Sequence, residues 1–343
     1  MAITRAQALD FFHSDDLIGL GMEADAVRRR LHPEGVVTYL IDRSISCTNA
    51  ESVTGNAASP LPCDLETICG KIAETLEMGG TGVLLSGVLL PGVPLQECVP
   101  PDMPLAPGIT WFEDLFSGVK QRFPQVWLQC FSAPEILTLA RLSSIPMHDT
   151  IARLRDAGLD SISGDGTEFL EGGSLTDGSH CTLEDWLAVH RTAHRLGMQT
   201  PAAMIFGSGE SFEDRVSYLD QLRRLQEETG GFTAFVPRNF RPRRTPGGPD
   251  EATAVECLKT LAISRLYLDN IENIQSSWTT QGLKVLQMGL RFGGNDAGSV
   301  TPQEAAAPGA PKSTTEEELR RIIRDAGFRP VQRDTSYRTM FLN

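Results

Sequence analysis

Six short apolar runs recur between residues 36 and 237, and stretches with helical spacing of apolar residues separate them. The runs are VVTYLI (36–41), TGVLLSG (81–87), VWLQCF (126–131), LDSIS (159–163), PAAMIFG (201–207) and FTAFVP (232–237). Strands that are apolar on both faces are typical of parallel sheets, because helices cover both sides of such a sheet. We therefore predict an α/β fold with repeated βαβ units: a TIM-type parallel β/α barrel, complete or partial. A doubly wound sheet is the alternative, but it would place a glycine-rich dinucleotide fingerprint after the first strand, and the sequence has none there.

The segments on either side of these units have a different pattern. Residues 1–35 contain two amphipathic stretches and predict an N-terminal helical segment, and the barrel is expected over residues 36–250. The apolar spacing of residues 252–268, 270–298 and 315–327 is helical, which predicts a C-terminal helical extension over residues 251–343 that completes the barrel. Residues 328–341 are a candidate last strand. The Pro-rich residues 89–108 predict an inserted loop or lid.

The composition limits the class of partner. The net charge of -13 argues against a nucleic-acid surface, because phosphate binding needs clustered Lys and Arg. No apolar run approaches the roughly 18 residues of a membrane span, and the N-terminus lacks the apolar core of a signal peptide, so we expect a cytoplasmic protein. Its seven scattered cysteines are then expected to be free thiols. We expect a small-molecule or nucleoside substrate and consider a homodimer as the assembly.

In a parallel β/α barrel the reacting groups lie at the carboxyl ends of the strands. The residues at the predicted ends supply carboxylates, two arginines and several hydroxyls: Asp42, Arg43, Ser86, Gly87, Ser132, Glu135, Ser163, Asp165, Glu168, Phe206, Ser208 and Arg238. This set contains no His, so it suits a polar or zwitterionic small molecule better than a zinc site.

Several of these residues also have a structural interpretation. Asp42 and Arg43 would then form an ion pair, Glu168 would cap a helix, and Arg191 would face solvent. His190 and His194 have the i, i+4 spacing of a metal pair, but the sequence shows no third ligand for them.

Eight segments resemble one enzyme family. They are HPEGVVTYLIDRSISCTN, GGTGVLLSG, FSAPEI, AGLDSISGDGTEF, EETGGFTAF, LAISRLYLDNIENIQSSWTTQGLKV, RFGGNDAGS and RDAGFRPVQRDT, in this order along the chain. With them the chain resembles the radical S-adenosylmethionine (SAM) enzymes of the futalosine route to menaquinone. The resemblance implies the radical SAM type of barrel and a SAM-shaped pocket.

The chain departs from this family at its iron–sulfur motif. In the family a Thr-Asn pair leads into CxxxCxxC, whose three thiolates hold a [4Fe–4S] cluster. Here Thr48 and Asn49 are followed by Glu51, Gly55 and Ala58 at the cysteine positions. We therefore expect no [4Fe–4S] cluster and no metal site. An expected His-x-His on the third strand is also replaced, by Trp127-Leu-Gln129.

The resemblance assigns the remaining candidate residues. For SAM it implies Ser86 and Gly87 near the amino-acid moiety, Ser132 and Glu135 at the third strand end, Ser161 and Glu168 toward the ribose, Arg191 toward the carboxylate, and Val236 against the adenine. Asp165, from the strand-end set, is a further candidate for SAM binding. On the substrate side it implies Asn273, Gln275 and Trp278, and Tyr39, Arg43, Phe206 and Arg238 are further candidate substrate contacts. The candidate bases or sulfonium partners are Glu51, Asp42 and Glu168.

Three functions follow from this combination. The first is a cluster-free enzyme of secondary metabolism that binds SAM, or a related nucleoside, and performs polar group transfer, elimination or cyclisation of the aminocarboxypropyl arm. Such an enzyme would be a transferase or a lyase. The second is a SAM-independent lyase or isomerase that acts on a futalosine-like nucleoside. The third is a non-catalytic paralogue that partners a true radical SAM enzyme.

Overall fold

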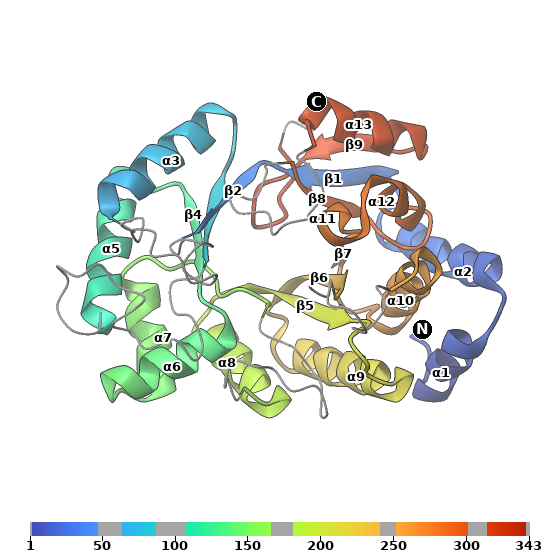
Figure 1. Cartoon of the computed structure of the whole chain (residues 1–343), viewed down its shortest axis with the longest axis horizontal. Helices are drawn as coiled ribbons and strands as arrows, with labels where there is room; N and C mark the ends of the chain where they lie inside the picture. Colours follow the sequence, from blue (N-terminus) through green and yellow to red (C-terminus); the bar gives the residue numbers. More distant parts are fainter. Residues whose placement is uncertain are drawn as a thin grey trace, which may run out of the picture.

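The structure is a computed structural model that describes residues 2–46, 64–86, 108–165, 181–240, 252–300 and 314–340. Its strands surround the centre of the molecule and its helices lie outside them (Figure 1). The residues Glu51, Gly55, Ala58, Gly87 and Glu168 lie outside the described residues, as does most of the predicted loop 89–108.

The helices lie where their caps and apolar spacing predict them, with one exception given below. They are α1 (Arg5–His13), α2 (Leu17–Leu31), α3 (Leu65–Glu77), α5 (Ile109–Arg122), α6 (Ala133–Ser143), α7 (Met147–Asp156), α8 (Leu183–Arg195), α9 (Phe212–Thr229), α10 (Ala254–Tyr267), α11 (Trp278–Gln281), α12 (Leu283–Gly289) and α13 (Glu316–Asp325). Thr182 at the start of α8 and Ser211 at the start of α9 form capping boxes with Asp185 and Asp214. None of the described helices is long and apolar enough to cross a membrane.

The strands form three parallel three-stranded sheets. One sheet has the order β8 (Asp296–Ser299), β1 (Val36–Leu40), β9 (Arg329–Gln332), and a second has β2 (Asp42–Ser46), β3 (Gly82–Ser86), β4 (Trp127–Cys130). The third has β5 (Thr200–Phe206), β6 (Phe232–Asn239), β7 (Asn273–Ile274). The first two sheets are joined through the chain, because β1 runs on into β2 after Ile41. A single bridge from Gln275, directly after β7, to Asp296 in β8 connects the third sheet to the first, and another bridge joins Gln129 in β4 to the isolated residue Ser161.

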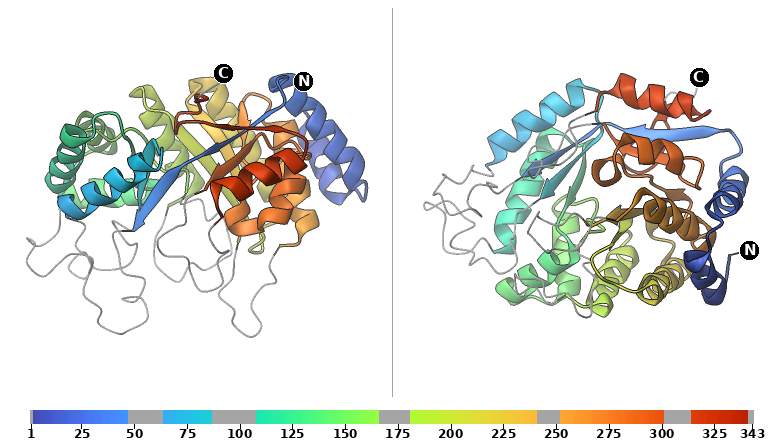
Figure 2. Two further views of the ribbon diagram at one scale, coloured as in Figure 1. Left: turned by 90° about the horizontal axis from the view of Figure 1, so that it is seen from above. Right: turned by 45° about the vertical axis from the view of Figure 1, so that its right-hand side comes forward.

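The predicted parallel α/β class is therefore confirmed, whereas the described strands form separate sheets around a common centre and no closed barrel. Seen from above, α2, α12 and α13 lie on one side of the strands and α3 and α5 on the other (Figure 2). The main core fills the space between strands and outer helices, with Phe112, Trp186 and Phe235 among its buried rings. A second core cluster lies under α12 and α13 and includes Val37, Tyr39 and Trp278.

Three local predictions were wrong. The first apolar run does not end at Asp42, because the strand resumes there as β2 and Asp42 pairs with Gly82, the first residue of β3. The run 159–163 contributes only the bridge at Ser161. Residues 270–298 are not one helical stretch but contain β7, α11, α12 and β8. The left-handed backbone of Gly282 and Gly293 (φ 82° and 98°) interrupts helical geometry there, and pairing with β6 and β1 stabilises the strands.

Candidate functional site

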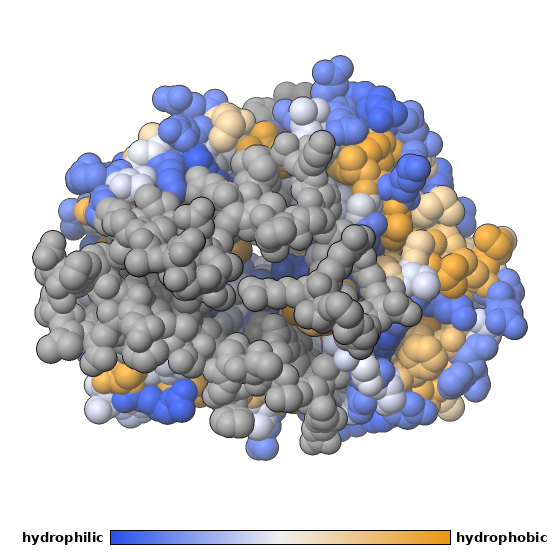
Figure 3. All heavy atoms as spheres, viewed as in Figure 1, coloured by the Kyte–Doolittle hydropathy of each residue, from blue (hydrophilic) through white to orange (hydrophobic). Residues whose placement is uncertain are grey.

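A cavity of about 170 Å³ lies at the centre of the strands. Hydrophilic side chains are visible at the centre of the molecule in Figure 3. The polar residues that line the cavity come from all three sheets and from the C-terminal segment: Asp42, Ser44, Gln129, Ser161, Ser163, Asp165, Gln199, Thr233, Arg238, Gln275, Thr279, Ser299, Arg333, Thr335 and Tyr337. Carboxylates, guanidinium groups and hydroxyls thus converge on one small space, as in a site for a polar small molecule.

The C-terminal segment forms the floor of this cavity. After β9 the chain leaves β1 and turns back on itself, since Met340 donates its amide to Gln332 and Asp334 donates its amide to Arg338. The Thr335 hydroxyl lies 3.2 Å from that of Thr81, directly before β3. The segment 333–340 therefore lies at the amino-terminal ends of β3 and β8, opposite to the end where we expected the reacting groups.

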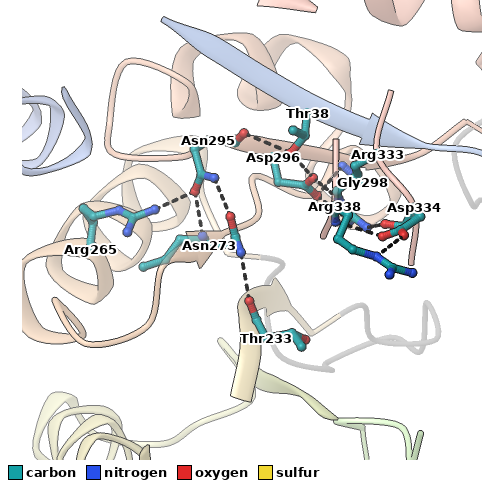
Figure 4. Close-up of polar contacts among 11 residues, drawn as sticks. Thr38, Thr233, Arg265, Asn273, Asn295, Asp296, Gly298, Arg333, Asp334 and Arg338 are labelled. Carbon is teal, nitrogen blue, oxygen red and sulfur yellow. Dashed lines mark hydrogen bonds and ion pairs between the residues drawn. The ribbon is translucent and has the colours of Figure 1, made fainter. Parts of the chain in front are cut away.

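A buried ion pair anchors this floor (Figure 4). Arg333 donates from Nε to one carboxylate oxygen of Asp296 at 2.5 Å and from a terminal nitrogen to the other at 3.0 Å. The side chains are 3% and 0% exposed. Thr38 donates its hydroxyl and Gly298 its amide to the same carboxylate, at 2.6 and 2.9 Å. Asp296 is thus satisfied on both oxygens, as a buried charge requires.

Asp42 lies next to this pair and lines the cavity. Burial raises the pKa of its carboxyl group, and the charge of Asp296 adds to that rise, while a hydrogen bond from Ser299 and the charge of Arg333 oppose it. Asp42 is therefore protonated to a higher pH than an ordinary aspartate.

A second polar pair lies on another wall of the cavity. Arg238 on β6 is 2.9 Å from a carboxylate oxygen of Asp165, and both side chains are about one third exposed. Ser163 donates its hydroxyl to the other oxygen of Asp165 at 3.1 Å. A partly exposed ion pair of this kind contributes little free energy to folding, so both side chains can give up the contact and bind a ligand instead.

The structure brings together seven of the residues predicted from the sequence, of which Ser163 is described above. Asp42, Ser161, Asp165, Val236, Arg238 and Gln275 all line the cavity. Trp127 and Gln129, which replace the expected His-x-His, line it as well. Ser86 lies beside this group, because its hydroxyl is 3.5 Å from that of the cavity residue Ser44.

Other predicted residues lie away from the cavity. Tyr39 and Arg43 point to the outer helices, where Tyr39 donates its hydroxyl to Glu316 on α13 and Arg43 pairs with Glu74 on α3. Arg191 pairs with Glu228 between α8 and α9.

The remaining predicted residues have structural contacts. Ser132 and Glu135 form the capping box of α6. The Phe206 ring is fully buried in the main core, and the Trp278 indole donates to the Ser299 carbonyl at 2.8 Å from within the second core. Asn273 holds β7 in place, because it donates to the Thr233 carbonyl and accepts from Asn295 (Figure 4).

Sequence reasoning missed the floor residues. Arg333, Thr335 and Tyr337 line the cavity but belong to a segment that we predicted only as a last strand. Arg333 and Thr335 do lie within the segment RDAGFRPVQRDT that carries the family resemblance, which was the available signal.

The histidine pair on α8 is structural in the described part of the chain. Thr200 hydrogen-bonds with Nδ1 of His190 at 2.8 Å and with Nε2 of His194 at 2.9 Å, so both rings point at one hydroxyl. Burial lowers the pKa of His194 to about 4 and that of His190 well below its ordinary value. Among the described residues no group of three His, Cys, Asp or Glu side chains could hold a metal ion.

Comparisons with known proteins identify the family. Residues 229–342 match the model of the CofH/MqnC C-terminal region. The chain is 34% identical to cyclic dehypoxanthine futalosine synthase of Streptomyces coelicolor, over 98% of this chain and 85% of that protein. It is 33% identical to the 5-amino-6-(D-ribitylamino)uracil–L-tyrosine 4-hydroxyphenyl transferase of Methanococcoides burtonii, over 92% of this chain and 90% of that protein.

The fold agrees with this relationship. The crystal structure of methylornithine synthase superimposes with a TM-score of 0.66 over 96% of this chain and 94% of that one, at 16% identity, a level that shows the fold alone. The chain therefore belongs to the radical SAM superfamily, in the family of the cyclic dehypoxanthine futalosine and aminodeoxyfutalosine synthases.

Proposed function

We propose that this chain is an enzyme that binds SAM, or a related nucleoside, in the central cavity and acts on it by polar chemistry without a [4Fe–4S] cluster. One observation carries the proposal. Glu51, Gly55 and Ala58 occupy the positions of the three cluster cysteines, although 34% identity to a synthase of the family extends over 98% of the chain.

The available donors do not fit the cluster. A carboxylate, a hydrogen and a methyl group cannot replace three thiolates that bind iron. Among the described cysteines, Cys69, Cys130 and Cys257 are buried on three separate elements, α3, β4 and α10. Burial raises the pKa of Cys130 well above its ordinary value, which disfavours its thiolate.

Polar chemistry on a sulfonium needs neither an oxidant nor a reductant. A nucleophile forms a bond to a carbon next to sulfur, the electron pair of the carbon–sulfur bond moves to sulfur, and a neutral thioether leaves. The nucleophile is a second substrate in group transfer and the ligand's own carboxylate in cyclisation. In elimination, a carboxylate takes a proton from the aminocarboxypropyl arm, the electron pair of that carbon–hydrogen bond forms a carbon–carbon double bond, and the carbon–sulfur pair leaves with the thioether. Each case requires positioning and at most one base.

The cavity offers partners for the charged end of such a ligand. Arg238 suits a carboxylate and Asp165 suits an ammonium or sulfonium, and in the absence of a ligand the two pair with each other at 2.9 Å. Val236 provides an apolar wall between polar residues. Glu51 and Glu168, outside the described residues, remain candidate bases.

Metal analysis tests the cluster-free part of the proposal. Iron and sulfide are measured after anaerobic reconstitution of the wild type, with a variant that restores the three thiolates (Glu51→Cys, Gly55→Cys, Ala58→Cys) as the matched comparison. We expect no stoichiometric iron in the wild type. A brown, iron-rich wild type would overturn the proposal.

Ligand binding tests the other part. Mass spectrometry of molecules that copurify with the protein is combined with calorimetric titration of SAM. We expect binding of SAM or of a thioether derived from it. Binding of adenosine without any affinity for SAM would instead favour a SAM-independent nucleoside lyase or isomerase. The absence of all nucleoside binding would leave the non-catalytic paralogue.

A further inference from the structure

Two carboxyl groups at the floor of the cavity share one guanidinium group. Asp42 and Asp296 both interact electrostatically with Arg333, which extends from the C-terminal segment. Asp42 begins β2 and Asp296 begins β8, so the two approach the floor from different sheets. One cation can fully compensate only one of two neighbouring carboxylates in a buried site.

The geometry assigns that cation to Asp296. Both carboxylate oxygens of Asp296 accept from Arg333, through Nε and one terminal nitrogen. The other terminal nitrogen donates to the Asp334 carbonyl at 3.0 Å. The Tyr337 ring covers one face of the guanidinium group, 3.6 Å from its central carbon to the ring centroid. All three nitrogens of Arg333 and one face are therefore engaged.

Asp42 has no comparable partner among the described residues. Its carboxyl group accepts hydrogen bonds from the Ser299 side chain and from its own backbone amide, and the described residues contain no ion pair to it within 4.0 Å. The side chain is only half-buried and lines the cavity, so one side of the carboxyl group faces the space where a ligand would bind.

We propose that Asp42 is a neutral carboxylic acid at the floor of the cavity, and that it donates a hydrogen bond or a proton to a neutral acceptor of the bound molecule. The acceptor class is a carbonyl oxygen or an unprotonated ring nitrogen. This inference rests on the proposed function and adds the orientation of the ligand. The charged end lies at Asp165 and Arg238, and a neutral heterocycle or carbonyl group lies at the floor.

The direction of proton transfer follows from this assignment. A base must lose its proton before the reaction, whereas a group that burial and a neighbouring carboxylate keep protonated can only give one. Asp42 therefore acts as a hydrogen-bond donor or general acid. Asp296 and Arg333 are positioning residues, because they act on Asp42 through charge and hold the floor.

A direct titration tests the protonation state without any ligand. The protein is prepared with aspartate labelled with ¹³C at the carboxyl carbon, and Asp42→Asn identifies the signal of Asp42 by removing it. We expect the chemical shift of a protonated carboxyl group at pH 7. A carboxylate signal for Asp42 at pH 7 would overturn the proposal, whatever the protein binds.

Two variants test the cause of that state. Asp296→Asn removes the competing carboxylate, so Arg333 becomes available and we expect the Asp42 signal to move to that of a carboxylate at pH 7. Arg338→Gln, on the same segment but in an exposed pair with Asp334, should leave the signal unchanged. If Asp296→Asn does not fold, the wild-type titration still decides the assignment.

Ligand affinity provides the second readout. SAM is titrated calorimetrically between pH 6 and 9 into the wild type and Asp42→Asn. We expect the wild-type affinity to fall above the pKa of Asp42, by up to about tenfold per pH unit, and the affinity of the variant to stay level. The same pH dependence in both proteins would contradict the donor role. If SAM binds to neither protein at any pH, the proposed function fails, and the titration of Asp42 still decides its protonation state.

Discussion

Replacing Arg333 with methionine should destabilise the protein strongly, because it leaves the Asp296 carboxylate buried without its cation. Asp296 is fully buried and accepts two of its four described hydrogen bonds from Arg333. Removing one partner of a buried pair costs about 3–5 kcal/mol, since the other charge stays desolvated. We therefore expect Arg333→Met to lower the free energy of unfolding by about 4 kcal/mol.

The same segment provides the control. Arg338 pairs with Asp334 at 2.8 Å, but its side chain is 80% exposed. Water screens such a pair, so Arg338→Met should cost less than about 1 kcal/mol. Urea denaturation followed by tryptophan fluorescence measures both variants at pH 7. Trp127 lines the cavity above the floor and reports on this region.

A double variant separates charge from packing. Adding Asp296→Asn to Arg333→Met removes the uncompensated charge, so part of the lost stability should return. The reasoning is refuted if Arg333→Met is no more destabilising than Arg338→Met, because the Asp296 carboxylate would then not depend on its buried partner.

Three further predictions concern other parts of the molecule. Burial lowers the pKa of His194 to about 4. The folded protein therefore binds fewer protons than the unfolded chain, and stability should fall by roughly 3 kcal/mol as the pH drops from about 6.5 to about 4. His194→Gln should make urea midpoints between pH 7 and pH 4.5 less dependent on pH, and an unchanged dependence would contradict this. Gly82→Ala places a methyl group against the Thr335 hydroxyl and the Trp127 carbonyl, so it should cost about 1–3 kcal/mol, and less in a Thr335→Ala background, in the same denaturation assay. Arg238→Met should weaken SAM binding at least about tenfold by calorimetry, whereas Arg191→Met, on the outer surface, should not; equal effects would argue against the cavity as the binding site.

Successive side chains of a strand alternate between its two faces, and this explains why only part of the site could be predicted from the sequence. A strand of a parallel sheet is apolar on both faces, so its pattern does not tell which residues face the centre and which face the outer helices. Asp42 lines the cavity, whereas its neighbour Arg43 pairs with Glu74 on α3. Tyr39 likewise lies under α13. Which alternate residues of a strand face the centre depends on the positions of the sheets and of the helices that cover them.

The sequence alone determined the α/β class, the positions of most helices and the family. Those properties depend on the local spacing of apolar residues, on capping residues such as Thr182 and Ser211, and on segments that resemble the family. All of these are features of short stretches of sequence. The sequence also predicts, through the family resemblance, that Glu51, Gly55 and Ala58 stand where the cluster cysteines would be.

Only the tertiary structure decided where the polar cavity closes and which carboxyl group has the buried cation as its partner. The floor exists because β9 pairs with β1, almost 300 residues earlier in the chain, which brings Arg333 to Asp296. No local pattern encodes a contact of that separation. The same contact engages the guanidinium group with Asp296. We therefore propose that Asp42, which the sequence predicted as a base, is an acid.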